Sequence, residues 1–206
     1  MSYQAWIAFM LACWVISVSP GAGAIASMSS GLNYGFKQGY WNALGLQLAL
    51  LVQIAIVAAG AGVLFATTEW AFLAVKWFGV SYLVYLAYMQ WTAPVSDIQI
   101  QQDKQIKSKA KLVWHGFLVN MSNPKAIVFL LAVLPQFLDL SKPQWMQYFI
   151  MAITMITIDL IVMAGYTGLA AKVLRLLKSP KQQKILNRSF AVLFVGAASL
   201  LSLVSQ

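Results

Sequence analysis

Charged side chains are scarce in this chain of 206 residues, of which only 9% are Asp, Glu, Lys or Arg. An ordinary soluble domain carries charge on about a quarter of its residues, which gives it a surface that water can solvate. Hydrophobic residues make up 61% of this chain instead. The scarcity of charge therefore excludes a soluble domain and predicts a membrane protein.

Cysteine and histidine are almost missing, since Cys13 and His115 are the only residues of their kinds. A single cysteine excludes an intramolecular disulfide, a Cys-x-x-Cys redox pair and a thiolate metal cluster. A membrane-embedded enzyme would need paired carboxylates, a histidine with a partner or a metal near the interface, and the sequence offers none of these. We therefore expect no enzyme, no catalytic residues, no metal and no cofactor. An integral-membrane enzyme and a structural membrane subunit are the alternatives from other classes.

Long apolar segments follow one another closely and leave no room for a soluble domain between them. The six segments cover residues 3–27, 38–66, 71–91, 112–138, 145–174 and 186–204. Tryptophans near the ends of these segments support the boundaries, because an amphipathic ring prefers the level of the lipid headgroups. The sequence predicts one multi-pass domain over residues 1–206, an all-α membrane protein with six transmembrane helices.

Basic residues give the chain a net charge of +9 and gather in the connections after the first, third and fifth segments. The positive-inside rule then places these connections, including a loop at residues 92–111, in the cytoplasm and both termini in the periplasm. We expect no nucleic-acid partner, because the charge follows the topology and not one soluble face. No Lys or Arg precedes Lys37, so the first segment lacks the basic start of a secretory signal and is predicted to be a retained helix.

Two of the six segments contain a proline at corresponding positions. Pro20 follows Ser19 in the first segment, and Pro124 follows Asn123 in the fourth. A unit of three helices is odd in number, so its second copy must be inverted in the membrane. The sequence therefore predicts two inverted three-helix repeats, residues 1–91 and 112–206, with helices 1 and 4 broken at Ser-Pro and Asn-Pro.

Ser-Pro and Asn-Pro are typical of a helix start, because Ser and Asn cap helices well and proline suits the first helical position. A restarting helix offers free N–H groups and the positive end of its dipole, which favour a carboxylate. Broken helices are tolerated at membrane depth only where they face protein or a water-filled cavity. A proline kink without function is the alternative for each motif alone.

Ionisable residues in the middle of the segments are a second indication of a site. Lys125 follows Pro124 directly, and Asp159 lies well inside the fifth segment. Such groups are costly in a bilayer and usually mark a solute pathway, although a buried Lys–Asp pair that only fixes packing is the alternative. Polar residues expected at comparable depth are Gln53, Tyr82 and Asn120. Polar groups that converge on broken helices predict a site for a small polar solute.

Four sequence segments resemble a known family of transporters. They are SPGAGAI from Ser19, GLNYGFKQG from Gly31, NMSNPKAIVFLLAVLPQF from Asn120 and IDLIVMAGY from Ile158. Over essentially its whole length the chain resembles the lysine exporter superfamily, in its homoserine and threonine branch and most closely its homoserine/homoserine lactone exporters. The resemblance implies a bacterial inner-membrane exporter of small amino acids that is coupled to the proton gradient. It leaves the substrate open, with threonine, cysteine or O-acetylserine, leucine and basic amino acids as alternatives.

These observations predict how a zwitterionic amino acid binds. Its carboxylate would lie at the half-helix N-termini after Ser19 and Asn123, assisted by Lys125, and its ammonium would bind Asp159 and the backbone carbonyls freed at the breaks. Because Asp159 is the only acid expected at depth, neutral amino acids are preferred over lysine or arginine. The predicted substrate-binding residues are Ser19, Pro20, Gly21, Gln53, Tyr82, Asn120, Asn123, Pro124 and Lys125, and Asp159 is the predicted proton-coupling residue.

Three glycines follow one another at four-residue spacing, namely Gly31, Gly35 and Gly39. This spacing permits close contact between helices, so the formation of a homo-oligomer is one alternative. Polar residues between these glycines favour a turn and a helix entry instead.

Overall fold

The computed structural model describes residues 1–65, 69–94, 108–139, 141–170, 172 and 179–202. All secondary structure within these residues is helical, which confirms the all-α prediction. The elements are α1 (Tyr3–Val18), α2 (Ala22–Phe65), α3 (Glu69–Thr92), α4 (Lys109–Met121), α5 (Pro124–Val133), the 3-10 helix η1 (Leu134–Phe137), α6 (Gln144–Gly168) and α8 (Pro180–Ser202). Most of the predicted cytoplasmic loop at 92–111 lies outside the described residues.

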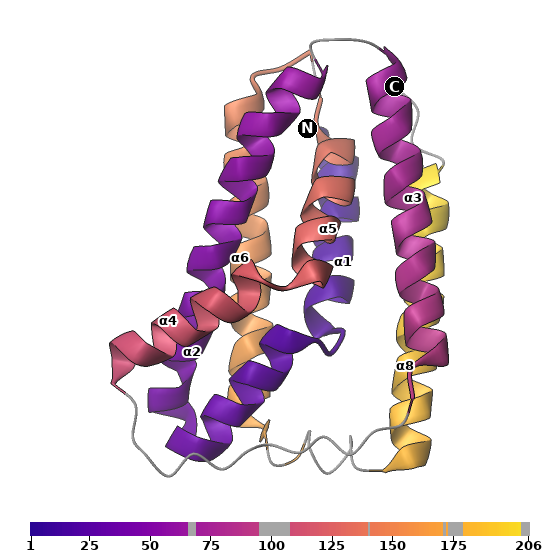
Figure 1. The fold of residues 1–206 in the computed structure, drawn as a ribbon. Helices are drawn as coiled ribbons and strands as arrows, with labels where there is room; N and C mark the ends of the chain where they lie inside the picture. Colours follow the sequence, from indigo (N-terminus) through magenta and orange to yellow (C-terminus); the bar gives the residue numbers. More distant parts are fainter. Residues whose placement is uncertain (66–68, 95–107, 140, 171, 173–178, 203–206) are drawn as a thin grey trace.

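The chain runs down and up one bundle several times; α1 and the beginning of α2 both run downward, and α4 and α5 both run upward (Figure 1). The beginning of α1 and the end of α8 lie at the same end of this bundle (Figure 1). Judged by length and apolar composition, two described helices are able to cross a membrane: α2 over Ala22–Gly60, and α6. The stretch from α4 to η1 is bent by 57° at its break and makes a third if it counts as one broken span.

The first interruption separates α1 from α2. Ser19 ends α1 in an extended conformation, with φ −67° and ψ 120°, as expected for a residue before proline. The backbone N–H of Ser19 donates to the carbonyl of Val15, and α2 begins only at Ala22. Ser19 therefore closes α1 and does not cap the start of the next helix, which differs from the sequence-based expectation for the Ser-Pro motif.

The second interruption separates α4 from α5. Asn123 is the N-cap of α5, because its side-chain oxygen accepts a hydrogen bond from the backbone N–H of Lys125 at 3.1 Å. Pro124 is the first residue of α5, where its missing N–H costs nothing. The local sequence thus explains why α5 begins at Pro124, and the Asn123 side chain fixes the position of the Lys125 backbone.

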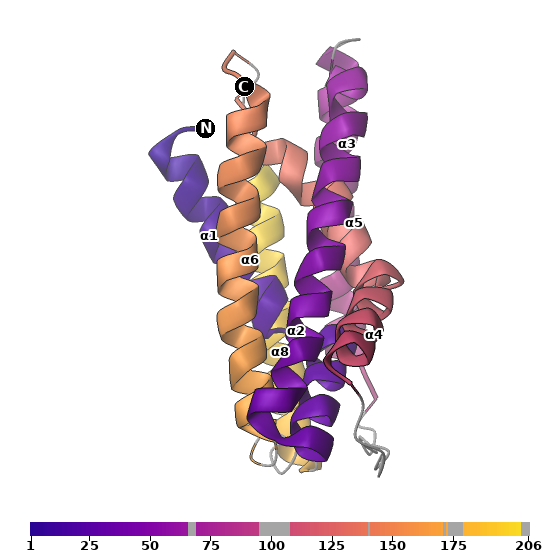
Figure 2. The ribbon, with the colours of Figure 1, turned by 90° about the vertical axis from the view of Figure 1, so that its left-hand side faces the viewer.

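A turn at Gly35 divides α2 into two helical legs that meet at the lower end of the bundle (Figures 1 and 2). Gly35 has φ 72° and ψ 173°, a conformation that residues with a Cβ atom rarely adopt. A Cβ on Gly39 would overlap the carbonyl of Ser30 on the other leg, and one on Gly31 would overlap the carbonyl of Thr167 in α6. The spaced glycines therefore serve a turn and close packing within one chain.

Small residues also allow α2 and α4 to cross closely. A Cβ on Gly45 would overlap the carbonyl of Val113, and a Cβ on Gly116 would overlap the carbonyl of Asn42. The side-chain amide of Asn42 donates to the carbonyl of Leu112 across the same contact at 3.3 Å. This crossing has the small-residue packing that is common between transmembrane helices.

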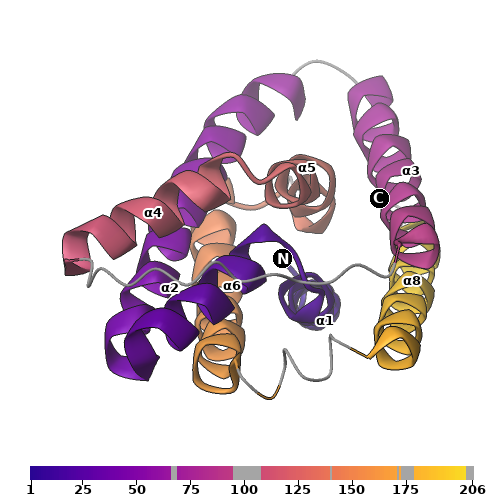
Figure 3. The same cartoon turned by 60° about the horizontal axis from the view of Figure 1, so that its bottom comes forward.

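Two shorter helices next to the interruptions, α1 and α5, lie between the longer helices (Figure 3). Seen obliquely from the lower end of the bundle, α1 and α5 stand between α2, α4 and α6 on one side and α3 and α8 on the other (Figure 3). Large apolar side chains face outward, such as Ile56 at 59% exposure and Val192 at 63%. Polar side chains such as Gln47 and Asn120 are buried. This distribution suits a bundle surrounded by lipid.

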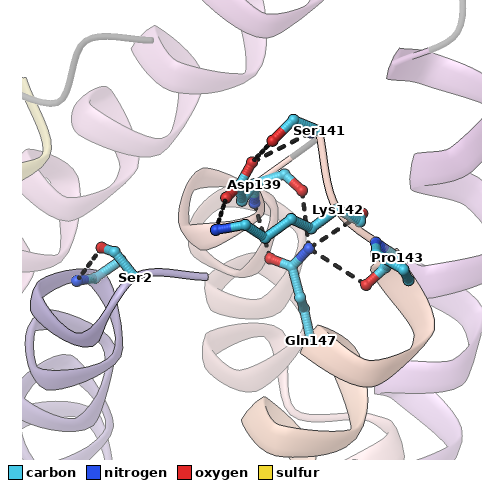
Figure 4. A network of polar contacts seen from close by, with 7 residues as sticks. Ser2, Asp139, Ser141, Lys142, Pro143 and Gln147 are labelled. Atoms are coloured by element: carbon cyan, nitrogen blue, oxygen red, sulfur yellow. Dashed lines mark hydrogen bonds and ion pairs between the residues drawn. The ribbon is translucent and has the colours of Figure 1, made fainter.

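A polar network fixes the turn between η1 and α6 (Figure 4). Gln147 accepts a hydrogen bond from the backbone N–H of Asp139 and donates to the carbonyl of Asp139, both at 2.8 Å. The Asp139 carboxylate accepts from the Ser141 hydroxyl and pairs with Lys142 at 3.0 Å. The hydrogen bonds from Ser141 and Lys142 lower the pKa of Asp139 to about 2. This turn is therefore held by side chains at the end of the bundle, away from the two interruptions.

Candidate functional site

Both helix interruptions border one small pocket. It has a volume of about 60 Å³ and is walled by α1, α2, α4, α5 and α6. The predicted site residues among its lining are Ser19, Gly21, Asn120, Asn123, Lys125 and Asp159. The pocket thus combines the ends of two helices with one basic and one acidic side chain.

Lys125 extends from the start of α5 to the end of α1. Its ammonium nitrogen donates to the backbone carbonyls of Ile16 at 3.1 Å and Ser19 at 2.7 Å. The last carbonyls of a helix have no intrahelical partner, so they are good acceptors for a cation. In this structure Lys125 therefore binds the backbone at the break in the first segment, and not a carboxylate.

Two further side chains bind the end of α1. The hydroxyl of Tyr166 on α6 donates to the carbonyl of Val18 at 2.6 Å. The amide of Gln90 on α3 donates to the hydroxyl oxygen of Ser19 at 3.1 Å. Side chains from three helices therefore hold the end of α1 by hydrogen bonds to Ile16, Val18 and Ser19.

Asp159 contributes the negative charge of the pocket from α6. Its carboxylate accepts a hydrogen bond from the side-chain amide of Gln47 on α2 at 2.6 Å. Among the described residues, the ion pair found within 4.0 Å is the one between Lys142 and Asp139. Lys125 and Asp159 therefore line the same pocket without a direct contact.

Asn120 and Gln53 stabilise the end of α4. Asn120 donates from its amide to the carbonyl of Leu46 at 2.9 Å, and its own carbonyl accepts from the Gln53 amide at 2.8 Å. Asn123 donates to the side-chain oxygen of Asn120 at 3.4 Å. Gln53 acts behind the pocket in this way and is not among its lining residues.

Three other predicted residues also lie outside the lining. Pro20 and Pro124 shape the backbone next to the pocket. Tyr82 is on α3, where its ring centroid lies 6.1 Å from that of Tyr85. The sequence suggests the depth of Tyr82 along the bundle, but the side of α3 that faces the pocket depends on how α3 packs.

Sequence reasoning missed four polar residues at this site: Ser17, which lines the pocket, and Gln47, Gln90 and Tyr166, which bind its other members. Gln47 and Gln90 lie in otherwise apolar stretches, the same signal that identified Gln53. In the part of the chain that the structure describes, no three His, Cys, Asp or Glu side chains gather closely enough to hold a metal ion.

Comparisons with known proteins give a consistent result. A family model described as LysE type translocator matches residues 14–205. The homoserine/homoserine lactone efflux protein of Salmonella typhimurium is 39% identical over 202 residues, which cover 98% of this chain and 98% of the relative. An uncharacterized membrane protein of Vibrio cholerae is 39% identical over 204 residues, with the same coverage. The leucine efflux protein of Klebsiella pneumoniae is 26% identical over 199 residues, covering 96% of this chain and 94% of the relative. No solved structure matches.

Proposed function

Because the chain belongs to the LysE family of translocators, we propose that it is a membrane transporter that exports small neutral amino acids, with homoserine and homoserine lactone as its substrates. Members of this family are translocators and not enzymes. The relative at 39% identity that is named for homoserine and homoserine lactone efflux matches almost the full length of both chains, which supports this substrate.

The observation that carries the proposal is the pocket at the two helix interruptions. A zwitterionic amino acid needs a partner for each of its two charges, and the pocket offers Lys125 and the N-terminus of α5 to a carboxylate and Asp159 to an ammonium. Asp159 is the single acid in the pocket lining, so a second positive charge on the substrate would have no carboxylate to pair with. This arrangement favours neutral amino acids over lysine and arginine.

Leucine is the second candidate substrate. The apolar part of the lining consists largely of Leu46, Leu50, Met155 and Met163, and thioether side chains adapt to different shapes. The relative named for leucine efflux shares 26% identity. An aliphatic side chain would replace the homoserine hydroxyl against this wall without changing the contacts of the charged groups.

The pocket volume of about 60 Å³ holds only a few water molecules. An amino acid is several times larger than one water molecule, so the pocket must widen to hold one. Export then requires the pocket to widen toward each side of the membrane in turn. The interruptions next to α1 and α5 are the points at which short helices can move relative to the long ones.

The proposed topology has six spans in a bacterial inner membrane. The first is α1 with the first leg of α2, and the fourth is α4 with α5 and η1; the other four are the second leg of α2, α3, α6 and α8. The interruptions then fall in the first helix of each of two inverted repeats. The common position of the start of α1 and the end of α8 supports an even number of spans, and the basic connections favour periplasmic termini (Figure 1).

Asp159 is the proposed proton-coupling residue. Its carboxyl can take up a proton after the substrate ammonium leaves and release the proton when an ammonium returns, which exchanges one proton for one substrate. At a membrane potential of about 100 mV, the entry of one proton provides about 2.3 kcal/mol. If one neutral amino acid leaves for each proton that enters, this energy supports an amino-acid concentration gradient of about fiftyfold.

The test is transport by the purified full-length protein in liposomes loaded with labelled homoserine, homoserine lactone, leucine or lysine. We expect release of homoserine and its lactone, faster with a pH gradient in the direction of proton entry, and no release of lysine. Release of leucine in preference to homoserine would identify leucine as the substrate. Release of none of these compounds above protein-free liposomes would overturn the proposal.

A further inference from the structure

The end of α1 forms a binding site for a primary ammonium group. The carbonyl oxygens of Ile16 and Ser19 converge on one nitrogen atom, at 3.1 and 2.7 Å. Ile16 belongs to the last turn of α1, where the partial negative charge of the helix dipole favours a cation, and Ser19 is the C-cap that follows this helix. The cation present in the structure is the side chain of Lys125, which comes from a different helix.

The surroundings of this nitrogen suit a protonated amine and not only a lysine side chain. An alkylammonium group has three N–H donors, and Lys125 directs two of them to Ile16 and Ser19. The carboxylate of Asp159 lines the same pocket as these acceptors. Two carbonyls, a helix C-terminus and a nearby carboxylate together provide what an amino group needs when it leaves water.

We propose that the carbonyls of Ile16 and Ser19, together with Asp159, are the amino-group subsite of the transporter, and that Lys125 is a tethered occupant which the substrate ammonium displaces. The inference rests on the proposed function and names the group by which the substrate is recognised. Lys125 fills the subsite in this structure. When it is displaced, its ammonium is free to pair with a carboxylate on the substrate.

The chemistry of the two proposed substrates supports an amino-group subsite. Homoserine and homoserine lactone share a protonated amino group, whereas the lactone has no free carboxylate. The amino group is therefore the charged group by which one site can bind both, and contacts to a carboxylate can add affinity only for homoserine. An amino-group subsite at the end of α1 meets this requirement for both compounds.

Gly21 borders the subsite next to the Lys125 side chain. A Cβ added to Gly21 would lie 3.5 Å from Cδ and 3.7 Å from Nζ of Lys125, which are ordinary contacts. The two hydrogen bonds from Lys125 to backbone carbonyls are the contacts that a competing ammonium must replace.

The first experiment empties the subsite and refills it. Lys125→Ala removes the part of the side chain that corresponds to propylammonium, so n-propylammonium should raise the melting temperature of the purified full-length variant in a saturable manner. The neutral analogue 1-propanol should have no effect, and the wild type should respond weakly because its subsite is filled. Equal responses of variant and wild type to n-propylammonium, or no response of either, would overturn the proposal.

The second experiment measures competition by Lys125. Lys125→Met keeps most of the volume and removes the charge, so homoserine lactone should bind more tightly to this variant. If the subsite is vacant in about a tenth of wild-type molecules, the gain is about tenfold, because apparent affinity scales with the vacant fraction. Lys142→Met is the matched control, since Lys142 pairs with Asp139 on the surface and should leave the affinity for the lactone unchanged. Unchanged or weaker lactone binding by Lys125→Met would show that Lys125 does not compete.

The third measurement uses the wild type and needs no variant to fold. n-Propylammonium should compete with homoserine lactone for binding, whereas propionate should not, and competition by propionate alone would assign the recognised group to a carboxylate. The transport assay separates this inference from the proposed function. A protein that exports homoserine but shows none of the ammonium effects refutes the subsite alone, and ammonium effects without any export refute the function alone.

Discussion

The side-chain amide of Gln47 donates a hydrogen bond of 2.6 Å to the carboxylate of Asp159 and joins α2 to α6 at the edge of the pocket. The hydrogen bond holds the carboxylate in place without neutralising it, because an amide has no charge to donate. Gln47 therefore helps to position Asp159, and in the proposed mechanism this carboxylate responds to a proton or to a substrate ammonium.

Asp159→Asn tests the coupling role of this carboxylate. The amide keeps the size of the side chain but cannot change its charge, so we expect the variant to lose pH-driven accumulation and to retain downhill exchange. For one proton per substrate, the wild type should concentrate homoserine about tenfold per pH unit, and the variant should show no gradient. Liposomes with an imposed pH difference measure this directly. A gradient in the variant equal to that of the wild type would remove Asp159 from the coupling mechanism.

Asp139 is an acidic residue outside the pocket, and it gives a matched control for pH effects. Because hydrogen bonds from Ser141 and Lys142 lower the pKa of Asp139 to about 2, this carboxylate stays ionised down to strongly acidic pH. Its contribution to folding is present above the ordinary carboxyl pKa and is lost as the pH falls toward about 2. Asp139→Asn should therefore leave the pH profile of efflux unchanged between about pH 5 and 8. A shifted profile would assign part of the pH response to the turn before α6.

The two prolines at the interruptions should matter more for transport than for membrane insertion. Pro124→Ala restores a backbone N–H and lets α4 and α5 approach one continuous helix, which moves Lys125 away from the end of α1. Pro20→Ala acts in the same way on the first interruption. We expect efflux to fall at least about tenfold, since a displacement of about 1 Å at a site can cost a hundredfold. Efflux divided by the amount of protein in the membrane is the measure.

Pro143→Ala is the control for these variants, because Pro143 precedes α6 at the end of the bundle and away from the pocket. Efflux that stays normal in both Pro20→Ala and Pro124→Ala would show that the prolines have only a structural role.

Close packing between α2 and α4 predicts a stability effect at Gly45. The Cβ atom of Gly45→Ala would overlap the carbonyl of Val113, so the crossing must open and the protein should lose about 1–3 kcal/mol. Gly165→Ala is the control, because a Cβ on Gly165 meets nothing within 4 Å. Melting temperatures in detergent should be lower for Gly45→Ala and unchanged or higher for Gly165→Ala. Equal melting temperatures would contradict the described contact.

The proposed topology predicts which parts of the chain face the periplasm. In a background with Cys13→Ala, which removes the single native cysteine, Ser2→Cys and Ser202→Cys should react with a membrane-impermeant maleimide in intact cells. Ser108→Cys, just before α4, should react only after the membrane is made permeable. Labelling of Ser2→Cys and Ser202→Cys from opposite faces of the membrane would rule out six spans.

Some features of the site follow from the sequence alone. The start of α5 at Pro124 is a local matter, because the Asn123 cap and the proline ring act within two residues of each other. The presence of a lysine and an acid among apolar residues is equally visible in the sequence. Distance along a helix also suggests that Lys125 and Asp159 reach a common depth, but it does not say which way either side chain faces.

Other features of the site could not be predicted from the sequence, because they depend on how the helices pack. Ser19 has the residue type of a helix cap, yet it closes α1 and accepts from Gln90, because its hydroxyl faces α3 in the folded bundle. Tyr82 is at a suitable depth but on a helix surface that does not line the pocket. Gln47 could have been chosen by the same criterion as Gln53, and only the packing around α2 shows that Gln47 binds Asp159 whereas Gln53 binds Asn120.

The sequence by itself determined that this chain is helical and apolar, and that helical structure is interrupted next to Pro20 and Pro124, since composition and proline geometry act within a few residues. Only the tertiary structure decided that Lys125 binds the carbonyls of Ile16 and Ser19. The donor and its acceptors are more than a hundred residues apart, and their meeting depends on α1 and α5 becoming neighbours between the longer helices (Figure 3). No local rule relates a lysine in one helix to the unpaired carbonyls of another, because that contact is a property of packing.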